Sequence, residues 1–229
     1  MSNDGDAAVR PEEIARIFIR PLGTVLPLGF LVFGSGVFLT AAYSLGWLPL
    51  DDGRDVFGIV LIYVVPVQAA AAVLAFLARD TAGGTTMAIF AATWAALATA
   101  SLGLKPGETS PAIGTFLAAD GVVILTLAIA ALFGNPAFAA ILAVSCARFA
   151  TNGAYELTGT KELGRISGWI GIVLSAVAAY VGLAFLLEDA RHERILPFIR
   201  QGAARESLED DLLQHLRRLE REPGVRTRL

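Results

Sequence analysis

Residues 21–50 read PLGTVLPLGFLVFGSGVFLTAAYSLGWLPL and contain no charged side chain. A helix that rises about 1.5 Å per residue crosses the hydrocarbon core of a bilayer in about 20 apolar residues. This stretch is long enough to form a first membrane-spanning helix, with Pro27 near its entry. Gly29, Gly34 and Gly36 thin one face of the helix, and small residues let a neighbouring helix or a permeating solute approach closely. That face is predicted to be either a packing seam or the wall of a path.

The composition of the whole chain is that of a membrane protein. Of its 229 residues 55% are hydrophobic and 17% are charged, and the mean hydropathy is +0.62. The net charge is only -3 and the basic residues gather toward the two ends, so binding to nucleic acid has no electrostatic support. The single cysteine, Cys146, cannot form an internal disulfide, and with two histidines it leaves too few ligands for a zinc site. No metal or cofactor is predicted.

Further apolar runs follow the first one, separated by short polar or turn-forming segments. Ser110 and Pro111 form an N-cap followed by proline at the first helical position, and residues 158–165 are expected to form a polar loop. The sequence therefore predicts an all-α membrane protein with six transmembrane helices within residues 21–188. The five further spans cover residues 56–78, 81–104, 111–133, 136–155 and 166–187.

The two ends of the chain are predicted to lie outside the membrane domain. Within residues 1–20 a short interfacial helix is expected. Residues 189–229 are expected to form a tail with an amphipathic helix that opens at a capping box at Ser207. That helix packs on its own protein or on the lipid surface, or it associates with other copies. Seven Lys and Arg residues flank the spans on the side of the termini and four on the other side, which places both termini in the cytoplasm.

Two charges fall inside predicted spans, Asp120 in the fourth and Arg148 in the fifth. Charged side chains in hydrocarbon are costly and usually face a partner or water. The turn near residues 134–135 places both charges at nearly the same depth on antiparallel helices. The structural interpretation is a buried ion pair. The functional interpretation is that Arg148, one turn beyond Ser145, draws in a carboxylate while Asp120 sets its orientation.

Ser35 lies between two glycines, a pattern that also occurs in intramembrane serine proteases. A nucleophilic serine needs a histidine or lysine nearby to take its proton. The predicted spans contain neither residue. The sequence therefore argues against an enzyme.

Several separated motifs carry a family resemblance. Pro27, Leu28 and Gly29, with Gly34 behind them, resemble the Asn-Pro-Ala-Pro-Leu-Gly-Leu signature of the acetate uptake transporter family, although Thr24-Val25-Leu26 replaces Asn-Pro-Ala. The last span and the segment after it are similar to the closing pattern of that family, with Ala-Gly-Trp-Ile-Gly, Ile-Tyr and Val-Leu-Pro. The matching residues are Ser167 to Gly171, Ala179-Tyr180 and Ile195 to Pro197, and Gln68 and Trp94 also stand where the family carries Gln and Trp.

The resemblance implies a homohexamer in the plasma membrane, in which each six-helix protomer has its own path for acetate or a related small carboxylate such as succinate. A bacterial member of the family narrows its path with a ring of Phe, Tyr and Leu, and the matching positions here are Phe33, Phe90 and Ser145. Gln68 lies in mid-span, where its amide either holds helices together or contacts the solute. A channel and a proton-coupled carrier both remain open, as do passage of another solute such as ammonia and a regulatory membrane protein without flux.

Overall fold

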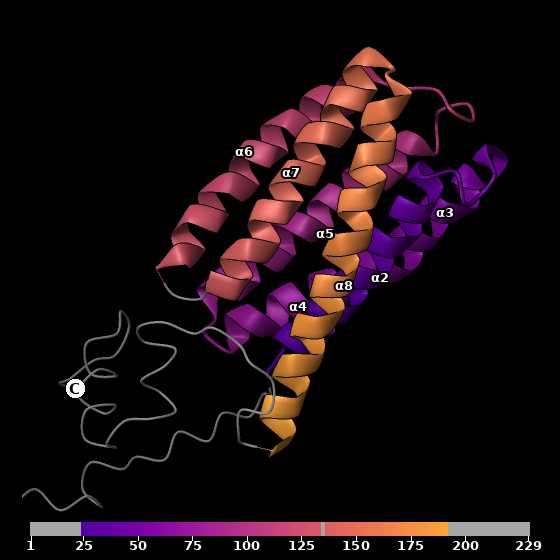
Figure 1. Cartoon of the computed structure of the whole chain (residues 1–229). Helices are drawn as coiled ribbons and strands as arrows, with labels where there is room; N and C mark the ends of the chain where they lie inside the picture. The colour runs from indigo at the N-terminus through magenta and orange to yellow at the C-terminus, as the bar shows by residue number, and fades with distance from the viewer. Residues whose placement is uncertain (1–23, 134–135, 192–229) are drawn as a thin grey trace, which may run out of the picture.

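The computed structural model describes residues 24–133 and 136–191, and every regular element in these two ranges is a helix (Figure 1). The predicted N-terminal interfacial helix and the amphipathic helix after Ser207 lie outside the described residues. The elements are α2 (Leu26–Ser44), η1 (Leu50–Asp52), α3 (Gly53–Ile59), the π-helical turn η2 (Val60–Val64), α4 (Val65–Leu77), α5 (Thr81–Ser101), α6 (Pro111–Leu132), α7 (Pro136–Thr158) and α8 (Lys161–Arg191).

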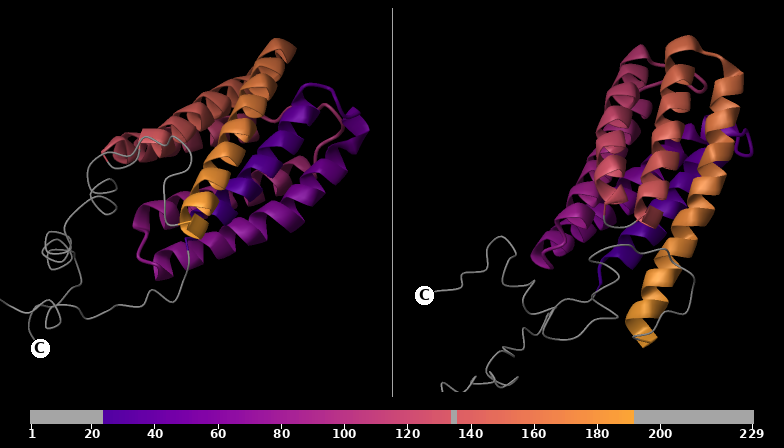
Figure 2. Two further views of the ribbon diagram at one scale, coloured as in Figure 1. Left: turned by 60° about the horizontal axis from the view of Figure 1, so that its bottom comes forward. Right: turned by 60° about the vertical axis from the view of Figure 1, so that its left-hand side comes forward.

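The described chain folds as a bundle of six long helical rods, because α3, η2 and α4 follow one another without a break. The main packing pairs are α2 with α8, α4 with α5, and α6 with α7. α7 and α8 are joined by a tight turn at one end of the bundle, as both views in Figure 2 show. The start of α2 and the end of α8 lie at the opposite end (Figure 1).

The glycines of α2 pack against three different helices. A Cβ atom on Gly34 would lie 3.3 Å from the carbonyl oxygen of Ser175 on α8, and the Ser175 hydroxyl donates a 2.7 Å hydrogen bond to the Gly34 carbonyl. Gly36 packs against Val64 of η2, and Gly29 packs against α5. Small residues at such contacts let membrane helices approach closely. The glycine-rich sequence of α2 therefore builds packing seams on several sides of this helix.

Four helices in the described part of the chain are long and apolar enough to cross a membrane: Leu26–Ser44, Leu50–Leu77, Pro111–Leu132 and Lys161–Glu188. The other two rods, α5 and α7, are richer in small and polar residues. In α5 the buried polar residues are Thr86 and Thr93, and in α7 they are Ser145 and Arg148. These two helices are less apolar because polar side chains on them face the interior of the bundle.

One predicted boundary of the last helix is wrong. The segment 158–165 is not a polar loop, because α7 continues to Thr158 and α8 already begins at Lys161. Gly159 adopts a φ of +70°, a conformation that glycine takes easily, and this allows the tight turn. At its other end α8 continues to Arg191, beyond the predicted apolar span. Charged residues can form the end of a helix when that end lies outside the apolar core. A prediction that treats every charged segment as a loop therefore ends the helix too early.

The cap of α6 and the π-helical turn η2 both follow from nearby residues in the sequence. The predicted cap of α6 is confirmed, because the Ser110 side chain accepts a bond from the Ile113 N–H at 3.5 Å and Pro111 occupies the first turn. The second rod contains the π-helical turn η2, which ends two residues before Pro66. Proline has no N–H to continue the hydrogen-bond ladder, so the preceding turn widens. Two residues beyond this proline, Gln68 is fully buried in the bundle.

Candidate functional site

Aromatic side chains from two helices meet in the interior of the bundle. The rings of Phe33 on α2 and Phe90 on α5 have centroids 4.6 Å apart at an interplanar angle of 39°. Trp94, one turn further along α5, lies 6.3 Å from Phe33 in an edge-on arrangement. All three side chains are buried. We call these three residues the aromatic cluster, and two of them are the residues predicted to form a constriction.

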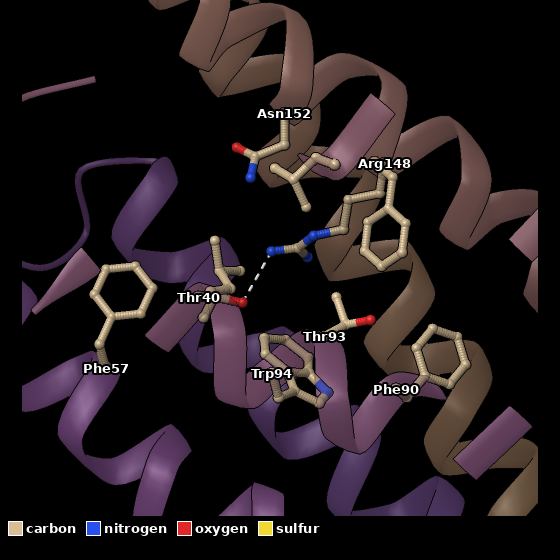
Figure 3. Close-up of a pocket in the computed structure, with 10 residues that line it drawn as sticks. Thr40, Phe57, Phe90, Thr93, Trp94, Arg148 and Asn152 are labelled. Carbon is tan, nitrogen blue, oxygen red and sulfur yellow. Dashed lines mark hydrogen bonds between the residues drawn. The ribbon is translucent and has the colours of Figure 1, made fainter. Parts of the chain in front are cut away.

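A cavity of about 40 Å³ adjoins the aromatic cluster, which is room for more than one water molecule. Its polar side chains come from three helices: Thr40 from α2, Thr93 from α5, and Arg148 and Asn152 from α7 (Figure 3). We call it the Arg148 cavity. The rest of its lining is apolar and comprises Phe57, Phe90, Trp94, Leu97, Leu117 and Phe149.

Arg148 is buried and fixed by hydrogen bonds to α2. Its Nη2 donates to Thr40 Oγ1 at 2.9 Å, and its Nη1 donates to the Val37 carbonyl oxygen at 3.3 Å (Figure 3 shows the bond to Thr40). The Thr40 hydroxyl is oriented in turn by a 2.9 Å bond to the carbonyl of Gly36. On α8, Gly171 leaves room for the guanidinium, because a Cβ atom there would overlap Nη1. The guanidinium is therefore held where α2, α7 and α8 meet.

Asp120 is also buried, but it faces a different partner. Its Oδ2 lies 2.7 Å from the Oγ1 of Thr93 on α5, and that hydroxyl also lies 2.8 Å from the carbonyl of Ile89. Within residues 24–133 and 136–191 no salt bridge joins Asp120 to Arg148, so the predicted ion pair is wrong. Equal depth on antiparallel helices did not determine which face each residue occupies. Asp120 turns from α6 toward α5, whereas Arg148 turns from α7 toward α2 and α8.

Ser145 and Gln68, the other predicted path residues, are fully buried. The Ser145 hydroxyl donates to the carbonyl of Ile141, one turn earlier on its own helix, at 2.9 Å. The Gln68 amide donates to the sulfur of Met87 at 3.9 Å. In the described residues, Gln68 Oε1 and Trp94 Nε1 are buried without a hydrogen-bond partner. Thioether sulfur is a weak acceptor, so Gln68 is held only loosely by its neighbour.

These contacts place polar groups on both sides of the aromatic cluster. Met87 lies one turn before Phe90 on α5, so Gln68 reaches the cluster from the side on which α2 begins. Thr40 lies about two turns beyond Phe33 on α2, so Arg148 reaches the cluster from the opposite side. The order along the bundle is therefore the Gln68 amide, the aromatic cluster and the Arg148 cavity.

Some residues of the cavity were not predicted from the sequence. Asn152 follows Arg148 by four residues, and this spacing places both on one face of a helix; the same spacing could have identified it. Thr40 and Thr93 carried no such signal, because threonine is common in apolar helices. The room that Gly171 leaves for the guanidinium depends on a helix packed from elsewhere in the chain.

Comparisons with known proteins agree with this architecture. A family model described as the GPR1/FUN34/yaaH family matches residues 6–198. The chain is 25% identical over 180 residues to the protein named succinate-acetate/proton symporter SatP of Escherichia coli (strain K12), and the SatP of Shigella flexneri matches to the same extent. The match covers 77% of this chain and 95% of the relative.

A solved structure described as that of the bacterial acetate channel SatP is similar to this one, with a TM-score of 0.70 at 23% sequence identity. The similarity covers 78% of this chain and 99% of the solved chain. At this level of identity the comparison shows a shared fold. Nearly the whole of the solved chain therefore has a counterpart in this chain.

Proposed function

The chain belongs to the GPR1/FUN34/yaaH family, and on this premise we propose that it is a membrane transporter or channel for acetate and related small carboxylates. One observation carries the proposal beyond family membership. A buried aromatic cluster in the bundle interior is flanked by an uncharged amide on one side and by a cavity with a cationic side chain on the other. An apolar constriction with polar groups on both sides is the arrangement expected for a path that selects a small, weakly hydrated acid.

All six rods cross the membrane in this proposal. α5 has 21 residues and α7 has 23, which at about 1.5 Å per residue gives lengths of about 32 and 35 Å, enough to cross the hydrocarbon core. Thr93 of α5 and Arg148 of α7 line the Arg148 cavity, and Thr86 and Ser145 are also buried inside the bundle, so a low apolar content does not argue against a crossing. At the end of the bundle away from the termini, the rings of Trp47 and Trp169 lie 6.0 Å apart and are about half exposed. Trp at such a position is typical of a membrane interface.

The orientation and the domain bounds in the proposal come from the sequence, and the hexamer comes from the family resemblance. The protein lies in the plasma membrane with both termini in the cytoplasm, which places the Arg148 cavity toward the outer face. Residues 21–188 form the membrane domain, and residues 1–20 and 189–229 flank it. Six copies assemble as a homohexamer, in which each protomer carries its own path. Large apolar side chains that are exposed on the single chain, among them Phe38, Ile62 and Val122, are then covered by lipid or by another copy.

The positive charge of Arg148 argues against passage of the ammonium cation, because a fixed buried cation repels a cationic solute. The alternative of neutral ammonia is tested by the reconstitution described below. A regulatory protein without flux has no need of a polar cavity beside an aromatic constriction. Transport of a carboxylate accounts for both features.

Reconstitution into liposomes tests the proposal. Labelled acetate should enter vesicles that contain the full chain faster than it enters protein-free vesicles. The same measurement with and without an inward proton gradient separates a channel from a proton-coupled carrier. Ammonia entry, followed with a pH-sensitive dye, should not exceed that of protein-free vesicles. If acetate entry equals that of protein-free vesicles while the protein is folded and inserted, the proposal is wrong.

A further inference from the structure

We infer that the Arg148 cavity is a binding site for one ionised carboxylate group on a short apolar chain, so that it favours monocarboxylates such as acetate over dicarboxylates such as succinate. This inference rests on the proposed function and specifies its substrate class. Three features of the cavity support it: the positive charge of Arg148, the N–H donors that remain available, and the absence of charge on the remaining walls.

The charge of Arg148 is not neutralised by the described part of the protein. A guanidinium stays protonated in proteins, and the partners that the structure gives it are a hydroxyl and a carbonyl, both uncharged. The buried Asp120 and the half-buried Glu156 are engaged elsewhere. Asp120 contacts Thr93, and Glu156 Oε2 accepts from the Ser110 N–H at 2.8 Å. A buried charge without a counter-charge is costly, and a bound carboxylate would supply the missing charge.

Donors for such a carboxylate are available at one side of the cavity. The guanidinium has more N–H groups than its two bonds use, and their planar arrangement suits the two oxygens of a carboxylate. Asn152 lies one turn further along α7, and Figure 3 shows its amide on the same side of the cavity as the guanidinium. The bonds to Thr40 and Val37 fix the guanidinium before a ligand arrives, which lowers the cost of binding.

The other walls of the cavity carry no charge. Phe90, Trp94 and Leu97 from α5 face it, together with Leu117 and Phe149. They suit the methyl group of acetate while its carboxylate contacts Arg148. The second carboxylate of succinate would meet these walls, and among the described lining residues there is no second cation to receive it. Burying an unpaired carboxylate is strongly unfavourable, so succinate should bind far more weakly.

The experiment compares binding and transport by the full-length protein. Acetate and succinate are titrated calorimetrically into purified wild-type protein and Arg148→Gln, and uptake of both solutes is measured in proteoliposomes. Wild type should bind acetate at least about 100-fold more tightly than succinate at pH 7, and Arg148→Gln should lose at least about 10-fold of the acetate affinity. Arg148→Lys, which keeps the charge but loses the planar pair of donors, should fall in between. Arg54→Gln is the matched control, because Arg54 is exposed at the start of α3.

Each result is decisive. Equal affinity of wild type for acetate and succinate would overturn the inference, as would unchanged acetate affinity in a folded Arg148→Gln variant. If Arg148→Gln does not fold, Asn152→Ala is used instead, because it removes an amide from the cavity and leaves the bonds of Arg148 to α2 intact. This variant should bind acetate about 3-fold more weakly or worse. An acetate affinity equal to that of wild type would overturn the inference. If wild type transports acetate with no dependence on Arg148 or Asn152, the proposed function stands and the inference fails. If wild type binds acetate but moves none, the proposed function fails and the binding site stands.

Discussion

Arg148 on α7 and Thr40 on α2 are 108 residues apart in the chain, and Nη2 of the first donates a 2.9 Å hydrogen bond to Oγ1 of the second. The bond connects the first described helix to the helix that carries the only buried cation in the described residues. Thr40 is in turn fixed by its bond to the Gly36 carbonyl. The orientation of the guanidinium therefore depends on the backbone of a glycine-rich stretch of α2.

The first prediction is that Thr40→Val weakens both stability and acetate transport. Valine has the same shape but accepts no hydrogen bond, and a bond to a charged group contributes about 1.5–3 kcal/mol. The free energy of unfolding, measured by denaturant titration in detergent, should fall by about that amount, and acetate uptake should decrease. Thr40→Ser keeps the hydroxyl and should behave like wild type. Equal stability and uptake for Thr40→Val and Thr40→Ser would contradict this role of the bond.

The second prediction concerns the aromatic cluster. Phe33→Ala and Phe90→Ala each remove a ring from a contact with centroids 4.6 Å apart, so the constriction should widen. Acetate uptake into proteoliposomes should change, and propionate or butyrate should enter relatively faster than in wild type. Phe38→Ala is the control, because Phe38 is on the same helix but 49% exposed. If both cluster variants fold and keep the flux and selectivity of wild type, the cluster is packing alone.

The third prediction follows from the separate partners of Asp120 and Arg148. Since Asp120 contacts Thr93 and Arg148 contacts Thr40, the effects of Asp120→Ala and Arg148→Ala on stability should add within about 0.5 kcal/mol. The check is a double-mutant cycle of unfolding free energies. If Asp120→Ala restored stability and transport to an Arg148→Ala protein, the two charges would be coupled after all. Asp120→Asn should cost less than Asp120→Ala, because an amide still bonds to the Thr93 hydroxyl.

Hydropathy and turn residues predicted an all-helical membrane protein and placed most helices correctly, because long apolar runs bounded by Gly, Pro and Ser leave few alternatives. The motifs around Pro27 and Trp169 predicted the family. The partners of Asp120 and Arg148 were predicted incorrectly. The position of a residue in the sequence gives its depth along a helix, but which neighbouring helix its side chain faces depends on how the helices pack. The prediction that Phe33 and Phe90 lie together came from the family resemblance. No pattern in the residues alone predicts this contact.

The fourth prediction concerns the tail. The family model matches the chain only to residue 198, and we therefore expect truncation after Gln201 to leave acetate uptake nearly unchanged. Uptake in proteoliposomes and the oligomer size by light scattering are the two measurements. A normal oligomer with lost uptake would show that the tail takes part in transport. A smaller oligomer would show that the predicted amphipathic helix after Ser207 holds copies together.

The last prediction uses Gly171, which packs against the guanidinium of Arg148. A Cβ atom at this position would overlap Nη1 and lie 2.6 Å from Cζ, and it would also lie 2.8 Å from the Cβ of Ala41 on α2. Gly171→Ala should therefore displace the guanidinium without changing the charge of the protein. We expect acetate affinity to fall about 10-fold, since the donors no longer face the cavity.

Two controls separate this effect from a general loss of packing. Gly58→Ala places a methyl group where no atom lies within 4 Å, so its acetate affinity should equal that of wild type. Gly34→Ala disturbs the contact between α2 and α8, 3.3 Å from the Ser175 carbonyl, at a residue that does not line the Arg148 cavity. It should lower the unfolding temperature while acetate affinity in the folded fraction stays intact. If Gly171→Ala behaves like Gly34→Ala, losing stability but not affinity, then the placement of the guanidinium does not control acetate binding.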